Sequence, residues 1–324
     1  MIRTFALDNG RLSPGGELSA AADGVVWADL FAPTKEEEHL AERWLGEEIP
    51  TREEMEEIEA SSRLYTEGTA QVMTVILPTQ TDNDKPLMAP VTFVLAPGKL
   101  ATIRYCEPKA FATFPQRAEK ASVGCASAET VLISLLEAIV DRLADVLERV
   151  GREIMTLSHA IFHPTATNAS KRDKDYQAML RQIGRKEEIV SNMQESLLTF
   201  ERLGGFLATA LVEGKSDKLA RARVKTLSRD IASLTEHAGF QSAKIGFLLD
   251  ATLGMISIEQ NAIIKIFSIA AVVLLPPTLV ASVYGMNFAH MPELAWEWGY
   301  PAALGLMVAA AVLPYLFFKR KGWL

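Results

Sequence analysis

The residues best suited to chemistry lie near the C-terminus, in the run Tyr284-Gly285-Met286-Asn287. The neutral carboxamide of Asn287 can accept hydrogen bonds from the waters around a strongly hydrated cation. A ring of such groups would hold a hydrated cation weakly, and conduction requires weak sites. Gly285 lets the backbone turn or pack closely, whereas Met286 is expected to pack, because a thioether is a poor ligand for a hard cation.

Other candidate groups carry less chemistry. His159 and His163 are four residues apart, a spacing that suits a transition metal, but no third ligand is evident and a solvated helix end is the alternative. Cys106 and Cys125 have no metal-ligand spacing and are expected to be reduced thiols. No phosphate loop, Ser/His/Asp arrangement or catalytic cysteine pattern is present, so the sequence does not predict an enzyme.

Two apolar segments must position the Gly-Met-Asn run. Residues 266–284 and 301–318 are uncharged stretches of roughly 19 and 18 residues, about the length that crosses a hydrocarbon core of ~30 Å. Pro276-Pro277 would damage a soluble helix, but neighbours and water can satisfy the freed carbonyls in a bundled membrane helix. The sequence predicts a transmembrane domain over residues 265–324, with a buried soluble hairpin as the alternative.

The basic residues predict the orientation of these spans. The loop 288–299 has no Lys or Arg, while Lys319-Arg320-Lys321 follows the second span directly. By the positive-inside rule, the loop is outside and both termini are cytoplasmic. The N-terminus has no apolar core of signal-peptide length, which agrees. We expect a multi-pass protein of the cell (inner) membrane.

Two helices per chain cannot enclose a water-filled pore, so conduction requires several copies around an axis. The first span offers a stripe of residues three or four apart, with polar groups at its ends and bulky apolar groups between them. A ring of such apolar side chains can close a pore by dewetting; helix–helix packing is the alternative reading. The stripe comprises Asn261, Ile264, Phe267 or Ser268, Ala271, Leu275, Thr278 and Ser282.

The preceding residues form two further parts. The formal net charge of −7 argues against a nucleic-acid partner, and a charged fraction of 23% excludes a protein in which membrane spans dominate the whole chain. Residues 1–127 predict a mixed α/β domain, with strands at 25–31, 72–79, 91–95 and 100–105 and helices after Thr34 and Thr51. Residues 128–264 predict long helices: one from Ala128 to a break at His163-Pro164, one over about 173–211, and one from about 217.

In its C-terminal residues, the sequence resembles the CorA family of magnesium and cobalt transport proteins. The resemblance lies in Gly285-Met286-Asn287 at the end of the first of two C-terminal spans, followed by Met291-Pro292-Glu293-Leu294. It continues through Trp296, the run 299–301 and the closing residues 319–324. A lone Gly-Met-Asn has no specificity, but its place after a span of this length, with loop and tail intact, is highly specific.

The resemblance implies a fold and an assembly. The fold would be an α+β cytoplasmic domain (an α/β/α sandwich), followed by long stalk helices and two C-terminal transmembrane helices in a homopentameric funnel. The first spans would line the pore, with Asn287 as the entrance ring and Thr278 as an inner polar ring. Leu275, Phe267 and Ile264 would form hydrophobic constrictions.

The resemblance also implies sites at both mouths of the pore. Glu293 and Glu297 would concentrate cations outside, and Asn261 and Asp250 would lie at the cytoplasmic mouth. Many members carry an acid just after Gly-Met-Asn-Phe, whereas this chain has Ala289-His290, which weakens the case for a strongly anionic entrance. The family is gated by Mg²⁺ bound between cytoplasmic domains. The candidate ligands here are Asp230, Asp250, Asp82 and Asp84, and a solvated turn is the alternative for the last two.

Three functions remain open from the sequence. The first is passive, potential-driven Mg²⁺ influx gated by cytoplasmic Mg²⁺, with Co²⁺ or Ni²⁺ as passengers. The second is Zn²⁺ transport of the related ZntB kind. The third is a membrane-anchored sensor or scaffold that conducts nothing. The polar Thr278 within the span and Asn287 at its end argue against this function.

Overall fold

The computed structural model describes residues 1–324 except 9, 20–23, 82–85, 121–123, 164–168, 215, 288–290, 293–295 and 323–324, and describes only the backbone of residues 60 and 169–173. The chain divides into two compact units. The first comprises Met1–Pro164 and Ala178–Leu249, and the second comprises Thr165–Gln177 and Asp250–Leu324.

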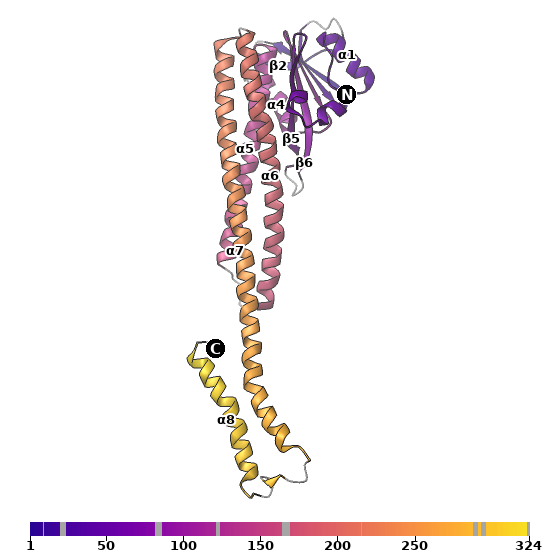
Figure 1. Ribbon diagram of the computed structural model, residues 1–324. Coiled ribbons are helices and arrows are strands. Elements are labelled where there is room, and N and C mark those ends of the chain that lie inside the picture. Colours follow the sequence, from indigo (N-terminus) through magenta and orange to yellow (C-terminus); the bar gives the residue numbers. More distant parts are fainter. Residues whose placement is uncertain are drawn as a thin grey trace. The chain divides into compact units, whose positions relative to one another are not determined.

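The first unit contains a seven-stranded sheet with the strand order β2-β1-β3-β7-β6-β5-β4 (Figure 1). β3 and β7 pair in parallel, and the other neighbouring strands pair antiparallel. The strands are β1 (Ile2–Asp8), β2 (Arg11–Pro14), β3 (Val25–Phe31), β4 (Leu64–Glu67), β5 (Ala70–Thr79), β6 (Leu87–Ala96) and β7 (Lys99–Arg104).

Both faces of the sheet are buried, because side chains alternate between two apolar layers. On β5, Met73 and Val75 pack on the side of α4 (Lys109–Lys120) and α5 (Ala128–Phe162). The alternate residue, Val72, packs on the other side. The helices of that other side are α1 (Lys35–Leu45), α2 (Arg52–Glu56) and α3 (Ala60–Arg63). The sheet therefore lies between helical layers, and the predicted α/β/α sandwich is confirmed.

A buried ion pair joins the two parallel strands. Arg104 on β7 donates from Nε and Nη2 to the two carboxylate oxygens of Asp29 on β3, both at 2.9 Å. The guanidinium lies between the rings of Phe31 and Phe111, about equally far from each centroid (4.8 and 4.9 Å). Because both side chains are only 2% exposed, removal of one partner would leave an uncompensated buried charge.

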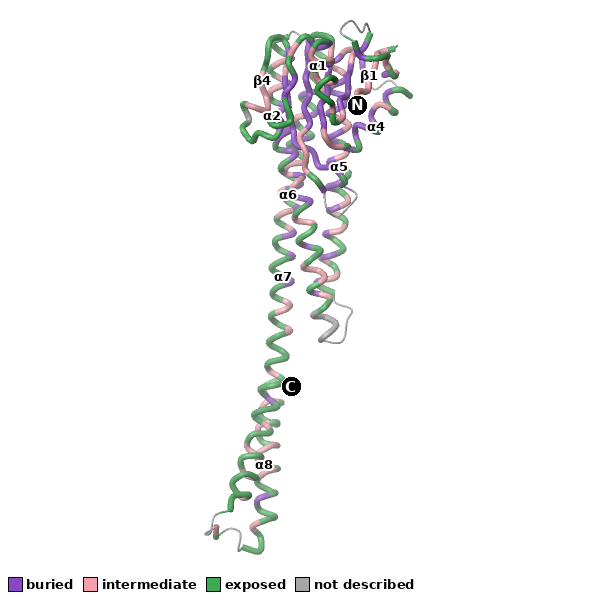
Figure 2. The backbone as a smooth tube through the Cα atoms, turned by 90° about the vertical axis from the view of Figure 1, so that its right-hand side faces the viewer, coloured by how far each residue is buried: buried purple, intermediate pink, exposed green. Residues whose placement is uncertain are grey.

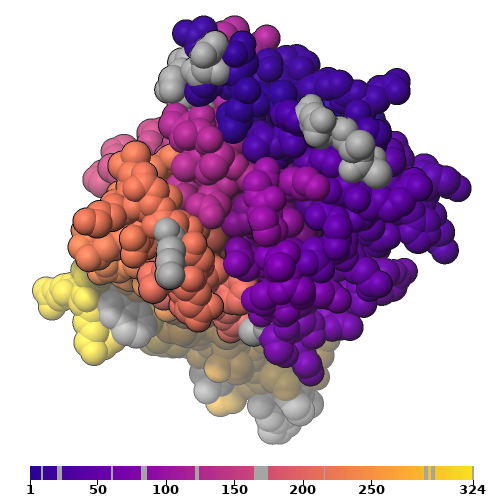
Figure 3. All heavy atoms as spheres, turned by 90° about the horizontal axis from the view of Figure 1, so that it is seen from above, coloured from indigo at the N-terminus to yellow at the C-terminus, as the bar shows by residue number. Residues whose placement is uncertain are grey.

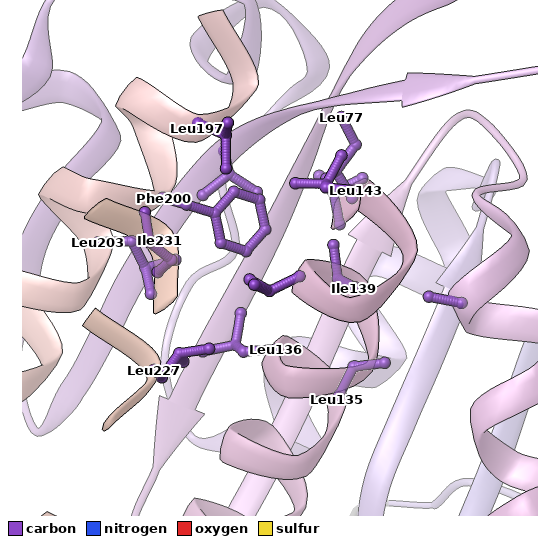
Figure 4. Packing of buried hydrophobic residues seen from close by; sticks show 14 of the residues in the cluster. Leu77, Leu135, Leu136, Ile139, Leu143, Leu197, Phe200, Leu203, Leu227 and Ile231 are labelled. Atoms are coloured by element: carbon purple, nitrogen blue, oxygen red, sulfur yellow. The ribbon is translucent and has the colours of Figure 1, made fainter. Parts of the chain in front are cut away.

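Three long helices form the remainder of the first unit and the start of the second. They are α5, α6 (Ala169–Glu213) and α7 (Lys218–Tyr284). Within the first unit their apolar stripes meet in one core (Figure 4), which contains Leu136, Ile139 and Leu143 from α5, Leu197, Phe200 and Leu203 from α6, and Leu227 and Ile231 from α7. Figure 3 shows these helices from above, with magenta and orange residues beside the indigo and purple residues of the sheet domain.

Helix α6 also covers an open strand edge. β4 pairs with Ala70–Met73 of β5, and none of the described strands pairs with the next residues of β5 on that side. The amide of Ile76 donates instead to Oγ1 of Thr199 on α6, at 3.2 Å. Thr199 in turn donates to the carbonyl of Ser196, at 2.7 Å. This contact ties a stalk helix to the sheet.

Most predicted elements in the first unit are present. α1 and α2 begin after Thr34 and Thr51, each with a complete capping box, and α5 ends at Phe162, just before the predicted break. The strands β1, β2 and β4 were not predicted. α6 begins and ends a few residues beyond the predicted range, and α7 continues through Pro276-Pro277 without interruption.

The second unit contains the end of α7 and α8 (Gly299–Arg320). Both helices are long and apolar enough to cross a membrane, and only 6% of the most apolar window in each is buried. Figure 2 shows them predominantly exposed. A soluble hairpin would bury its apolar side chains, so this exposure favours the transmembrane prediction over that alternative.

Candidate functional site

The Gly-Met-Asn run forms the end of helix α7. The amide of Gly285 donates to the carbonyl of Ala281 at 2.9 Å, and the amide of Met286 donates to that of Val283 at 3.3 Å. A Cβ atom on Gly285 would lie 3.1 Å from the Ala281 carbonyl oxygen. The glycine is thus explained by close packing on its own helix. Asn287 follows directly and is exposed.

The predicted stripe on the first span is exposed along its whole length. Ile264, Phe267 and Leu275 have exposed fractions of 61%, 71% and 65%, and Asn261 and Ala271 are exposed as well. Because α7 is continuous through its two prolines, the three- and four-residue spacing keeps these positions on one face. Within the part of the second unit that the structure describes, this face is not covered by protein.

Thr278 contributes an acceptor to this face. Its Oγ1 donates to the carbonyl of Leu274 at 2.7 Å, while the side chain stays exposed. The hydroxyl proton is therefore used within the helix, and the lone pairs of the oxygen remain available. An acceptor of this kind suits a cation or the water that hydrates it. A hydroxyl that donates to its own helix is compatible with a pore lining and with helix–helix packing.

The loop between α7 and α8 is described only in part. Glu293 lies outside the described residues, and Glu297 is exposed. The amide of Gly299 donates to the carbonyl of Trp296 at 2.9 Å, which forms the turn into α8.

Two of the four candidate regulatory carboxylates lie in the described part of the chain. Asp230, in the first unit, and Asp250, in the second, are exposed residues of α7. Asp82 and Asp84 lie outside the described residues. Among the residues that the structure describes, no group of three or more His, Cys, Asp or Glu side chains could hold a metal ion.

An acidic row on α5 was missed by the sequence reasoning. Burial raises the pKa of Asp141, Arg117 opposes that shift, and the negative charges of Glu137, Asp145 and Asp230 add to it. Asp230 of α7 therefore belongs electrostatically with α5 residues. The four-residue spacing of 137, 141 and 145 was the available signal, but it gives no indication of the third helix.

The two histidines that were considered as ligands stack on each other. The rings of His159 and His163 are 4.5 Å apart, and Nδ1 of His163 lies 3.3 Å from the carbonyl oxygen of His159. Neither belongs to a group of three possible ligands among the described residues. Their arrangement is that of an exposed helix end.

The fold and the residues at the C-terminal end of α7 together define a class of protein. An α/β/α domain and a three-helix stalk precede two apolar C-terminal helices, and the first of these ends in an exposed amide with oxygen acceptors along one face. This is the architecture of a two-span membrane transporter for a small hydrated cation.

Comparison with known proteins places the chain within a family. A family model described as "CorA-like Mg2+ transporter protein" matches residues 22–320. The chain is 35% identical to the magnesium transport protein CorA of Haemophilus influenzae and 38% identical to that of Pasteurella multocida, with 100% of each chain covered. This chain belongs to the CorA family, as the resemblance in its C-terminal residues predicts.

Solved structures share the fold at low sequence identity. The complete CorA magnesium transporter of Methanocaldococcus jannaschii matches with a TM-score of 0.77 and 16% identity, over 100% of this chain and 99% of that chain. The ZntB cytoplasmic domain of Vibrio parahaemolyticus matches with a TM-score of 0.51 and 9% identity, over 79% of this chain and 97% of that one. The predicted fold class, with its sheet domain, stalk and two apolar helices, is confirmed.

Proposed function

We propose that this chain is one subunit of a homopentameric Mg²⁺ channel that mediates passive influx. The observation that carries the proposal is the exposed Asn287 at the end of a membrane-length helix. It occurs in a chain that matches proteins named as magnesium transport proteins over its whole length. Five copies of α7 around an axis would bring five Asn287 side chains together at one mouth.

The uncharged side chains of the stripe suit a hydrated ion. The Asn287 carboxamides would accept hydrogen bonds from the waters of Mg²⁺, and the Thr278 oxygens would form a second acceptor ring along the path. Between Thr278 and the other end of the helix, Leu275, Phe267 and Ile264 would form constrictions that close by dewetting. Asn261 would return the ion to a polar environment, and Ala271 would leave room between the narrow rings.

The membrane potential would drive the flow. Moving one elementary charge across 100 mV is worth about 2.3 kcal/mol, and a divalent cation gains about twice that. No chemical coupling is then needed for entry into a cell that is negative inside. Co²⁺ and Ni²⁺ would follow the same path, because a ring of neutral amides distinguishes hydrated divalent ions poorly.

The orientation follows from the charges at the ends of the spans. Lys319, Arg320 and Lys321 would lie at the cytoplasmic side of the inner membrane, with both termini, by the positive-inside rule. Glu297, and Glu293 in the same loop, would then concentrate cations outside. Attraction by exposed charges is screened within ~8 Å at physiological salt, so this loop would capture ions and would not select them.

Cytoplasmic Mg²⁺ would close the pore by occupying sites between subunits. Asp230, Asp250, Asp82 and Asp84 are the candidate ligands. Metal at such sites would neutralise acidic faces that otherwise repel, and its loss would let the subunits separate. Flux that no longer responds to internal Mg²⁺ after neutralisation of these carboxylates would support this gate, whereas unchanged regulation would remove it.

The decisive experiment is uptake into proteoliposomes loaded with a magnesium-sensitive dye, under an inside-negative potential. We expect uptake with the native protein and its loss with Asn287→Ala. Val280→Ala is the matched control, because it truncates a side chain of the same helix on the side opposite to the stripe; it should keep the native rate.

Other ions and other outcomes separate the remaining functions. Zn²⁺ flux without Mg²⁺ flux in the same vesicles would move the assignment to zinc transport. Folded, oligomeric protein that passes neither ion would indicate a sensor or scaffold.

A further inference from the structure

The cytoplasm-proximal end proposed for α8 carries three consecutive cations directly after an uncharged helix. Residues 299–318 contain no charged side chain, and Lys319, Arg320 and Lys321 follow without a carboxylate nearby in the sequence. All three are exposed. Within the described residues, no recorded ion pair balances the charge of these three side chains.

The local geometry keeps the cations near the end of the helix. Nζ of Lys321 lies 5.2 Å from the centroid of the Phe317 ring, a cation–π contact. The amide of Lys321 donates to the carbonyl of Phe317 at 3.1 Å, so the helical path continues to this residue. An ammonium group held over an aromatic ring of the apolar segment lies at the boundary between apolar and polar surroundings, where lipid phosphates are found.

The residues at the N-terminal end of α8 support the same position of this helix across the membrane. Trp296, Trp298 and Tyr300 are exposed by 60%, 67% and 75%, and such amphipathic rings are enriched at membrane–water interfaces. The 22 residues of α8 span about 33 Å, close to the ~30 Å of a hydrocarbon core. With the aromatic residues at one interface, the three cations reach the headgroup layer of the other.

We propose that Lys319, Arg320 and Lys321 form a binding site for the phosphate of an anionic phospholipid. The planar guanidinium of Arg320 can donate two parallel hydrogen bonds to phosphate oxygens, and the two ammonium groups add compact positive charge. The chain has a net charge of −7, so the protein as a whole is not expected to be attracted to an anionic surface. The preference for an anionic lipid would come from these three cations alone. This site does not depend on the ion that the protein conducts.

Thermal unfolding of the full-length assembly in neutral detergent tests the site. Phosphatidylglycerol should raise the Tm of the native protein by a few degrees, and phosphatidylcholine should not. The triple variant Lys319→Gln/Arg320→Gln/Lys321→Gln should lose most of that rise. Lys319→Arg/Lys321→Arg, which keeps the charge, should retain it, as should the control Arg11→Gln/Lys35→Gln/Lys120→Gln, which removes three exposed cations from the sheet domain.

A second measurement keeps the test independent of how the triple variant folds. Raising the salt from about 0.1 M to about 1 M shortens the Debye length from ~10 to ~3 Å, and should abolish the phosphatidylglycerol effect on the native protein. An effect equal in phosphatidylcholine, or unchanged in a folded triple variant or in high salt, would overturn the proposal. The same rise with inorganic phosphate alone would also overturn it, because the site would then recognise a free anion.

Discussion

Asn287 and Thr278 present oxygen atoms without a formal charge. The Thr278 hydroxyl donates a hydrogen bond to the Leu274 carbonyl. Asn287 is exposed at the end of the helix, where the amide of Gly285 donates to the Ala281 carbonyl. Neutral acceptors suit an ion that keeps its waters, because they exchange hydrogen bonds without the strong attraction of a carboxylate. The charge of the residue at position 287 should therefore control how long the ion stays.

Asn287→Asp tests this reasoning on the proposed filter. Five carboxylates at one ring should bind Mg²⁺ more tightly, so uptake should saturate at a lower external concentration while the maximal rate falls severalfold. Asn287→Gln is the matched variant, since it keeps the neutral carboxamide and should remain closer to the native protein in saturation. Both are measured by the dye assay over a range of Mg²⁺ concentrations. A higher maximal rate in the Asp variant with unchanged saturation would contradict weak binding at this ring.

Among the helices and strands, α6 has a role that its own apolar stripe does not reveal. Its Thr199 accepts a hydrogen bond from the Ile76 amide. Ile76 lies in the part of β5 that extends beyond the residues paired with β4. Thr199 is 8% exposed, so water does not replace this acceptor freely. A buried amide without a partner costs roughly 1–3 kcal/mol.

Thr199→Val should therefore lower the stability of the sheet domain by roughly 1–3 kcal/mol, because valine has a similar shape but cannot accept the Ile76 hydrogen bond. Thr209→Val is the control: its Oγ1 donates only to the Gly205 carbonyl of the same helix and is exposed. Hydrogen exchange of the Ile76 amide and thermal unfolding of the full-length protein are the measurements. Equal effects of the two variants would show that the edge contact contributes nothing specific.

For the whole molecule, the two apolar helices and the basic residues after them predict that both termini lie on one side of the membrane. The physical reason is the cost of moving Lys319, Arg320 and Lys321 across the hydrocarbon core, whereas the loop before α8 has no Lys or Arg. The large sheet domain would then stay on the same side as these cations.

Labelling of single cysteines in intact cells tests this orientation, in a background in which Cys106 and Cys125 are replaced by serine. Trp298→Cys, in the loop before α8, should react with a membrane-impermeant maleimide from outside. Lys35→Cys, an exposed residue of the sheet domain, should react only after permeabilisation. The reverse pattern would invert the topology, and labelling of both positions in intact cells would refute the two-span arrangement.

The C-terminal spans and the helix-end triplet were predictable because their signals are local. Absence of charge over about the membrane thickness, basic residues on one flank, and the position of Asn287 all lie in consecutive residues. The starts of α1 and α2 were predictable for the same reason, since Thr34 and Thr51 bond to amides only three residues away. Conduction, gating and the fivefold assembly depend on contacts between copies, and they remain proposals.

The tertiary structure alone decided which distant residues meet. β1 is half-buried without alternation, so its place beside β3 follows from pairing across the chain and not from its own pattern. The Asp29–Arg104 pair, the Ile76–Thr199 contact and the position of Asp230 near the acidic row of α5 join residues that are 75, 123 and 89 positions apart. Sequence spacing encodes the periodicity of one helix or strand, whereas the packing of one element on another depends on the whole core.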